Sequence, residues 1–184
     1  MTVDTAPASP ITAKRVVWLF SCVVLLAVAL IWAWLSMRSV MGVGGSCASG
    51  GPYEIATPCP DGSWLIAIAI PMMIITAMVG SGFAATMSAP NLLLPMWFLL
   101  FASLGWNFLE FGIFRGGTEV GWIVCGVLFM AMALPVLFLI PVGRKHPPKR
   151  PEGTPPLWWW IGCYLGLASV GVSLGAWVYA AVST

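Results

Sequence analysis

One acidic residue stands inside an apolar stretch of the sequence. Glu110 lies in the run 92–114, three residues after Asn107 and seven after Ser103. Residues three and four apart share a face of a helix, so these polar side chains form one stripe. Lipid offers no hydrogen-bond partner, and the stripe should therefore face the interior of a helix bundle. A carboxylate in that position can bind a proton, a cation or a polar ligand, or it can form an ion pair.

Two arginines can reach the level at which Glu110 lies. Arg38 follows the first apolar run, and Arg115 comes five residues after Glu110. Ser103 is near the middle of its run, so Glu110 lies about 10 Å from the centre and within about 5 Å of the edge of a 30 Å hydrocarbon core. We expect it to contact Arg38, Arg115 or Asn107. Two interpretations remain: a proton, cation or ligand site, or a pair that holds the ends of the first and third helices together.

Cys47 and Cys59 are the two cysteines of the glycine-rich segment 38–63. If that segment is exported, oxidising conditions favour a disulfide between them. The bond would close a loop of about 13 residues and stabilise it by roughly 3 kcal/mol in the chain-entropy model. A redox-active pair is a weaker alternative because the spacing is not C-x-x-C. A metal site with Glu54 or Asp61 would lack an accompanying histidine.

No other residues form a pattern that predicts catalysis. The single histidine, His146, lies in the basic, proline-rich segment 143–156 and cannot supply two axial ligands to a haem. The sequence has no phosphate-binding glycine-rich loop, nucleophile elbow or metalloprotease motif. We therefore expect no catalytic residue, no metal and no cofactor. The formal net charge of +2 gives no reason to expect a nucleic-acid partner.

Five apolar stretches provide the elements that must position these residues. Of the 184 residues, 60% are hydrophobic and 8% are charged, whereas a soluble domain has roughly 25% charged residues. Each stretch has about 22 to 26 residues, enough to cross about 30 Å of hydrocarbon. The first is too long for the apolar part of a signal peptide and reads as an uncleaved anchor. We predict an all-α bundle of five transmembrane helices at 16–37, 64–87, 92–114, 120–142 and 157–182.

Lysine and arginine are distributed unevenly between the two sides of this bundle. With the N-terminus in the cytoplasm, six of them are cytoplasmic and only Arg38 and Arg115 are outside. The positive-inside rule favours that orientation. We therefore predict an exported C-terminus and a five-helix domain over 16–182, with a cytoplasmic tail at 1–15, an exported loop at 38–63 and a basic cytoplasmic loop at 143–156.

Glycines recur at the spacing of close helix packing in the last apolar stretch. Gly162 and Gly166 form one G-x-x-x-G pair, and Gly171 and Gly175 form a second. Such pairs let two helix backbones approach closely. We predict that both pairs pack against other helices of the bundle. A contact between two copies of the chain is the alternative.

Two segments resemble a known family. One runs from Met37 through G-G-x-C-A-x-G-G-P-Y and the later C-P, and the other is W-N-F-L-E-F-G at 106–112. Both are similar to segments of a family of uncharacterised integral membrane proteins of actinobacteria. The resemblance implies a bacterial plasma membrane and no particular activity.

Three functions are compatible with these features. Small size, few polar residues within the helices and an ordered exported loop favour a non-enzymatic membrane protein that packs against an envelope complex. The alternative is a carrier or binder of a small molecule or ion that uses Asn107 and Glu110. A membrane thiol-disulfide enzyme using Cys47 and Cys59 is the third. The expected partners are the lipid bilayer and either another membrane protein or a second copy of the chain.

Overall fold

The structure is a computed structural model that describes residues 12–45, 47–48, 57–115, 119–145 and 154–183, and within them it is all-helical. The prediction of an all-α fold is thereby confirmed. Each of the five helices is long and apolar enough to cross a membrane. The helices are α1 (Ala13–Gly42), α2 (Leu65–Thr86), α3 (Leu93–Phe114), α4 (Val120–Lys145) and α5 (Leu157–Val182).

Four of the helices begin close to where the sequence predicts, but α1 is longer at both ends. It covers Ala13–Gly42 instead of 16–37, so Arg38 lies inside a helix and not in the loop predicted at 38–63. The apolar run ends at Met37, but arginine, serine and methionine are all compatible with a helix interior. Hydropathy therefore marks the apolar part of α1 and not the end of its hydrogen-bonded backbone. α4 likewise continues past 142, to Lys145.

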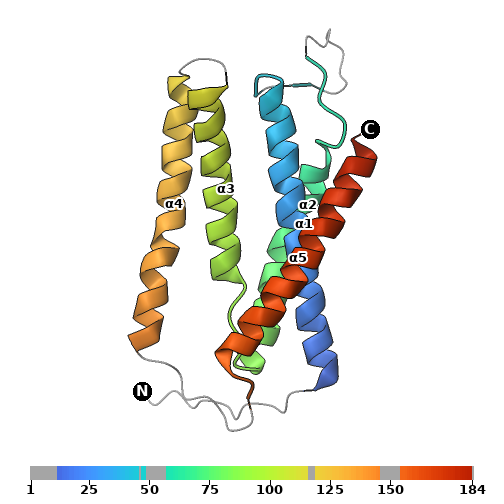
Figure 1. Ribbon diagram of the computed structural model, residues 1–184, viewed down its shortest axis with the longest axis vertical. Coiled ribbons are helices and arrows are strands. Elements are labelled where there is room, and N and C mark those ends of the chain that lie inside the picture. Colours follow the sequence, from blue (N-terminus) through green and yellow to red (C-terminus); the bar gives the residue numbers. More distant parts are fainter. Residues whose placement is uncertain (1–11, 46, 49–56, 116–118, 146–153, 184) are drawn as a thin grey trace.

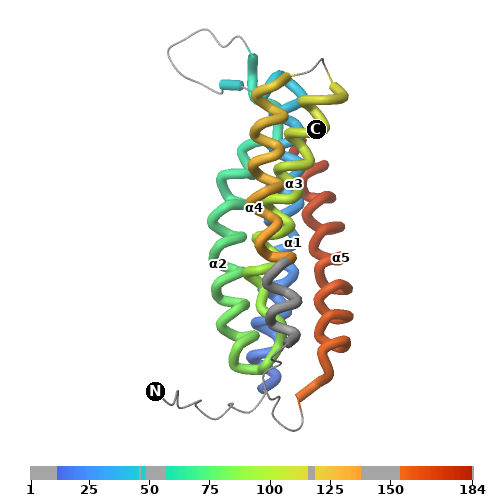
Figure 2. The backbone as a smooth tube through the Cα atoms, turned by 90° about the vertical axis from the view of Figure 1, so that its left-hand side faces the viewer, coloured from blue at the N-terminus to red at the C-terminus, as the bar shows by residue number. Residues whose placement is uncertain are grey.

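The five helices form two groups (Figure 1). α2 and α5 both pack on α1, and Figure 2 shows them on opposite sides of it. α3 and α4 form an antiparallel hairpin beside this group. Among the described residues α4 packs only on α3, whereas α3 also contacts α1 and, less extensively, α2. The contact between α1 and α3 is therefore the main link between the two groups.

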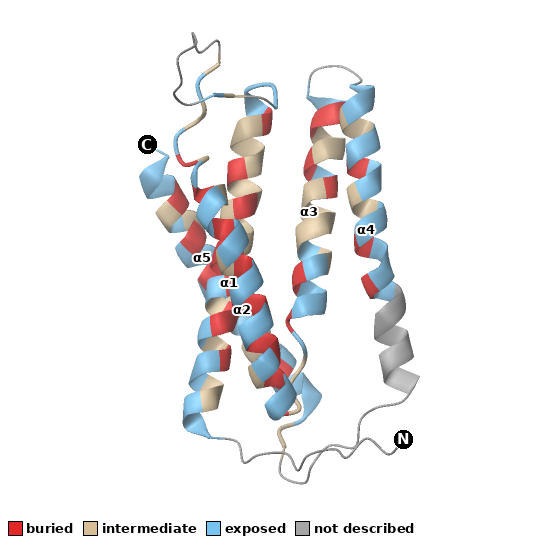
Figure 3. Cartoon of the chain, turned by 180° about the vertical axis from the view of Figure 1, so that it is seen from behind, coloured by how far each residue is buried: buried red, intermediate tan, exposed pale blue. Residues whose placement is uncertain are grey.

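The buried core lies where α1, α2 and α5 meet. Its fully enclosed members include Leu19 and Ala29 of α1, Met73 of α2 and Trp160 of α5. Figure 3 shows buried positions concentrated along α1, while the described part of α4 is exposed along most of its length. The exposed positions are themselves largely apolar. A surface of this composition requires an apolar surrounding.

Only one of the two predicted glycine pairs packs inside the molecule. A Cβ atom at Gly171 would lie 2.6 Å from the carbonyl oxygen of Val24, and one at Gly175 would lie 3.2 Å from the Cα of Val28, so this pair fits against α1. A Cβ atom at Gly162 or Gly166 would have no described atom within 4 Å, so for this pair the described residues show no packing contact of the predicted kind. Gly171 follows Gly162 by nine residues, about two and a half turns, which places the two pairs on opposite faces of α5.

A second glycine contact joins α3 to α4. A Cβ atom at Gly105 would lie 2.9 Å from the backbone nitrogen of Met130, and one at Gly126 would lie 3.0 Å from that of Leu109. The two helix backbones therefore approach closely over this stretch, as small residues permit. On the same hairpin, the Trp97 indole nitrogen donates a hydrogen bond to the backbone oxygen of Met132 at 3.0 Å.

Candidate functional site

A bidentate ion pair joins α1 to α3. Arg38 donates from Nη1 to Oε2 of Glu110 at 2.6 Å and from Nη2 to Oε1 at 2.9 Å. The two residues are 72 positions apart in the chain. Two parallel bonds between a guanidinium and a carboxylate are the most specific geometry that these groups can form. This pair fixes the distance and the rotation of α1 relative to α3 at one level of the bundle.

Two further residues complete this cluster, which we call the clamp: Arg38, Asn107, Glu110 and Arg115. Arg38 Nη1 also donates to Oδ1 of Asn107 at 3.0 Å. Arg115 Nη2 lies 3.3 Å from Oε1 of Glu110. The structure thus brings together all four polar residues that the sequence singles out near this level.

Aromatic rings enclose the charges of the clamp. The guanidinium carbon of Arg38 lies 5.2 Å from the centre of the Trp34 ring and 5.6 Å from that of Phe111. Arg115 lies over Phe111 at 5.0 Å. Cations in contact with aromatic faces gain electrostatic stabilisation, and more so where water is excluded. No signal in the sequence indicates this role of Trp34, because a tryptophan near a helix end is typical of a headgroup anchor.

The members of the clamp differ in burial. The side chains of Arg38 and Glu110 are 24% and 19% exposed, whereas that of Arg115 is 54% exposed. Asn107 is completely buried, and its Nδ2 donor has no hydrogen-bond partner among the described residues. Both carboxylate oxygens of Glu110 are engaged by arginine. A cation or proton could therefore use Glu110 only by displacing Arg38, so this geometry favours a structural role.

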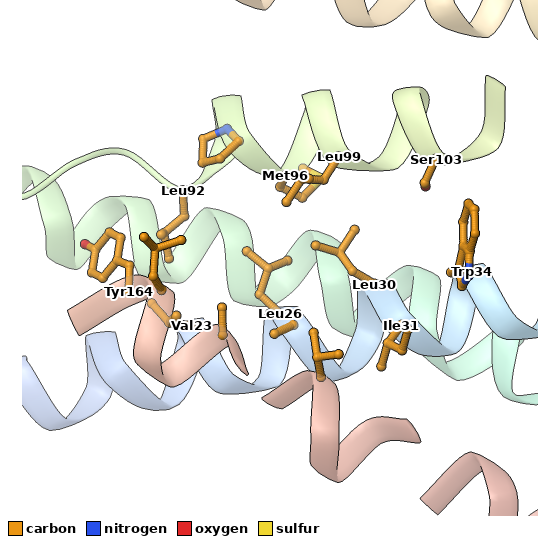
Figure 4. A pocket seen from close by; sticks show the side chains of 15 residues that line it. Val23, Leu26, Leu30, Ile31, Trp34, Leu92, Met96, Leu99, Ser103 and Tyr164 are labelled. Atoms are coloured by element: carbon orange, nitrogen blue, oxygen red, sulfur yellow. The ribbon is translucent and has the colours of Figure 1, made fainter. Parts of the chain in front are cut away.

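An apolar groove begins one helical turn from the clamp. It lies between α1, α3 and α5 and has a volume of about 350 Å³. Figure 4 shows Trp34 and Ser103 at one end of it and Tyr164 and Leu92 at the other. Trp34 precedes Arg38 by four residues, and Ser103 precedes Asn107 by four. The clamp therefore continues the same faces of α1 and α3 that line the groove.

The groove exists because α5 packs on α1 without reaching α3. Among the described residues no packing contact joins α5 to α3. At the end away from the clamp, the hydroxyl of Tyr164 donates to the backbone oxygen of Pro90 at 3.2 Å and joins α5 to the turn between α2 and α3. Sequence reasoning missed this groove, because its lining consists of the same residue types as the core.

A disulfide lies at the end of the bundle that is nearer the clamp, which we call the disulfide end. The structure joins Cys47 to Cys59 with their Cα atoms 4.9 Å apart, as the sequence predicts. The backbone nitrogen of Ala48 donates to the oxygen of Thr57 at 3.1 Å and closes the base of the loop. Glu54 lies outside the described residues, as does His146. No group of three or more acidic, histidine or cysteine residues in the described chain is placed to hold a metal ion.

The segments that flank the disulfide contact helices of both groups. Gly45, at a φ of +79°, lies against the ring of Trp122 on α4, where a Cβ atom would be 2.8 Å from the ring. Gly62, at a φ of +82°, lies against Tyr179 of α5. The hydroxyl of Ser36 donates to the backbone oxygen of Gly62 at 3.3 Å. Positive φ values at these two positions favour glycine. The segments beside the disulfide thus pack onto α1, α4 and α5 and, like the clamp, connect the two helix groups.

The chain matches no protein-family model, no curated protein and no solved structure. Its function has to be inferred from its own residues. Their arrangement comprises the clamp, the apolar groove below it and the disulfide above it.

Proposed function

We propose that the chain is a multi-pass protein of a bacterial plasma membrane, with its N-terminus in the cytoplasm and its disulfide end exported. Five apolar helices support membrane insertion, and the six-to-two distribution of lysine and arginine supports the orientation. The first helix begins and the last helix ends at opposite ends of the bundle (Figure 1), as an odd number of crossings requires. The resemblance to actinobacterial membrane proteins supports the plasma membrane.

Its role is non-enzymatic: it is an accessory component that packs against another membrane protein of the cell envelope. The observation that carries this proposal is the bidentate pair of Arg38 and Glu110. Charged groups at membrane depth are costly unless they are paired, and where they are free they mark transport paths. Here Arg38 and Glu110 neutralise each other, and the pair holds the α3–α4 hairpin against α1. These two charges therefore hold the helices in one relative position.

A fixed shape with an apolar outer surface is what a packing partner can recognise. Among the helices of the described chain α4 packs on α3 alone, and Val124, Val127 and Leu128 are exposed on it. Helices in membranes associate by close packing of such complementary surfaces. The clamp determines where α4 lies relative to α1, α2 and α5, so any partner that touches both groups depends on it.

Co-purification from native membranes tests this proposal. The tagged protein is extracted in mild detergent and compared with Arg38→Met, which breaks the clamp, and with Arg115→Ala, which leaves the bidentate pair intact. We expect one protein to co-purify stoichiometrically with the wild type and with Arg115→Ala, and to be depleted from Arg38→Met. Recovery of the chain without another protein, or equal recovery of the partner with all three, would contradict the accessory role.

A second candidate function is the binding of a small molecule next to Asn107 and Glu110. The unpartnered Nδ2 of Asn107 favours it, because a buried donor without an acceptor costs about 1–3 kcal/mol. A ligand that supplies the acceptor would recover that free energy. The apolar groove that ends one helical turn from this residue indicates the class of molecule.

A further inference from the structure

We propose that the groove binds one long-chain fatty carboxylate, with its hydrocarbon chain along the groove and its carboxylate toward Arg38 and Asn107. This inference requires the membrane insertion proposed above but not the accessory role. The proposal rests on the volume of the groove, on its apolar lining, on its lateral opening and on the charge of the clamp beyond one end.

The dimensions of the groove fit a single hydrocarbon chain. Its lining on α1 runs from Val23 to Trp34, eleven residues or about 16 Å along the helix. The groove has a volume of about 350 Å³ over that length, whereas a helix segment about 16 Å long and 10–12 Å across occupies roughly 1,300–1,800 Å³. A helix with its side chains therefore does not fit. Carbon atoms in contact are about 3.5–4.0 Å apart, so one extended chain does.

The walls of the groove offer only apolar contacts to such a chain. Leucine, valine, isoleucine, alanine, methionine and proline make up most of the lining. Its two hydroxyl groups are already used: Ser103 donates to the oxygen of Leu100 at 2.9 Å, and Tyr164 donates to that of Pro90. A polar molecule would find few partners along these walls. A hydrocarbon chain would replace empty space with van der Waals contacts.

A chain can enter the groove sideways from the bilayer. α5 does not pack on α3 in the described part of the molecule, so the space between them is not closed by a helix contact. Trp34 and Ser103 line the groove at its end nearer the clamp, and the link between Tyr164 and Pro90 crosses the opposite end. Lateral entry therefore needs no movement of the clamp.

The clamped end of the groove is complementary to an anionic acceptor. Arg38 and Arg115 carry two positive charges against the one negative charge of Glu110, which leaves the clamp with a formal charge of +1. Asn107 lies one turn beyond Ser103, is completely buried, and its Nδ2 donor has no partner in the described part of the chain. A carboxylate supplies both the negative charge and the acceptor, and charge-assisted bonds of this kind are the stronger class. An alcohol head would supply the acceptor alone.

Photolabelling in reconstituted membranes tests the proposal. The full chain is placed in phosphatidylcholine vesicles with palmitic acid that carries a photoreactive diazirine in its chain. Two further probes carry the same diazirine: the matching fatty alcohol, and a phosphatidylcholine with that acyl chain. Labelled peptides are identified by mass spectrometry. We expect palmitate to label α1, α3 and α5 at the groove, excess unlabelled palmitate to compete, and the alcohol and the phospholipid to label about tenfold less, a difference of about 1.4 kcal/mol.

Two size-matched variants separate the groove from the general bilayer surface. Ala168→Phe places a ring in the groove, and Ala131→Phe makes the same change at an exposed position of α4. We expect about tenfold less labelling with Ala168→Phe and wild-type labelling with Ala131→Phe. If Ala168→Phe does not fold, Leu99→Trp fills the same space from α3.

Each of the remaining outcomes overturns part of the proposal. Equal labelling by the phospholipid would show that an ordinary bilayer chain fills the groove, and equal labelling by the alcohol would exclude recognition of the carboxylate. Labelling that ignores Ala168→Phe and Leu99→Trp would place the ligand elsewhere. None of these results alters co-purification of a protein partner, so failure here is distinguishable from failure of the accessory role.

Discussion

Arg38 and Glu110 meet across the α1–α3 contact, where Nη1 of the arginine donates to Oε2 of the carboxylate at 2.6 Å and Nη2 donates to Oε1 at 2.9 Å. This contact is the main link between the α1, α2, α5 group and the α3–α4 hairpin. The pair therefore acts on the relative position of two helix groups and not only on its own neighbourhood.

The two arginines of the clamp should differ in their effect on stability. Arg115 makes one contact of 3.3 Å with Glu110 and is 54% exposed. Ion pairs at exposed sites contribute about 0–1 kcal/mol, so Arg115→Ala should lower the free energy of unfolding in mild detergent by less than about 1 kcal/mol. Arg38→Ala should lower it by clearly more. An Arg115→Ala variant as unstable as Arg38→Ala would contradict the geometry described for the clamp.

The two glycine pairs of α5 should respond in opposite ways to the same substitution. Gly171→Ala places a methyl group 2.6 Å from the backbone oxygen of Val24 and should destabilise the protein by about 1–3 kcal/mol. Gly166→Ala meets no described atom within 4 Å and should stabilise the helix by up to about 1 kcal/mol. Thermal unfolding of both variants is the measurement. Destabilisation at Gly166 would indicate that this face packs on another molecule, which is the alternative that the sequence left open.

Cys47 and Cys59 should be found as a disulfide in protein taken from intact cells. The measurement is mass spectrometry of peptides alkylated before any reduction. Cys47→Ser should lower the free energy of unfolding by about 3 kcal/mol, since it releases a loop of about 13 residues. Two free thiols in the native protein would rule out the bond. A pair that alternates between oxidised and reduced forms would instead favour the thiol-disulfide enzyme.

The orientation of the chain predicts where a reporter enzyme becomes active. Alkaline phosphatase fused after Thr184 should be active, because that reporter folds only outside the cytoplasm. The same reporter fused after Gly153, in the basic loop between α4 and α5, should be inactive. A well-expressed but inactive fusion at Thr184 would refute a cytoplasmic N-terminus combined with five crossings.

The sequence predicted the helices well because apolar length is a strong and local signal. It also predicted that Glu110 would contact Arg38, Arg115 or Asn107, since an unpaired carboxylate at that depth is costly. It could not predict which arginine forms the bidentate pair, because that depends on the rotation of α1 about its axis. The extension of α1 to Gly42 decides it, since Arg38 is then fixed on a helix.

The groove and the glycine contacts show two different limits of sequence reasoning. No periodicity distinguishes the groove from the core, because the same apolar residue types line both. What separates them is that α3 and α5 do not pack on each other within the described residues. The separation of Gly162 from Gly171, by contrast, is a matter of counting: nine residues turn a helix by about two and a half turns. The two pairs could therefore have been assigned to opposite faces from the sequence.

The central claim, that Arg38 and Glu110 act together as a structural link, is tested most directly by a double-mutant cycle. The free energy of unfolding in mild detergent is measured for the wild type, Arg38→Met, Glu110→Leu and the double variant. Each single change leaves a partly buried charge without its partner and should cost about 2–4 kcal/mol. The double variant removes both charges and should be more stable than either single variant. A double variant whose loss equals the sum of the two single losses would show that the residues act independently and would contradict the account.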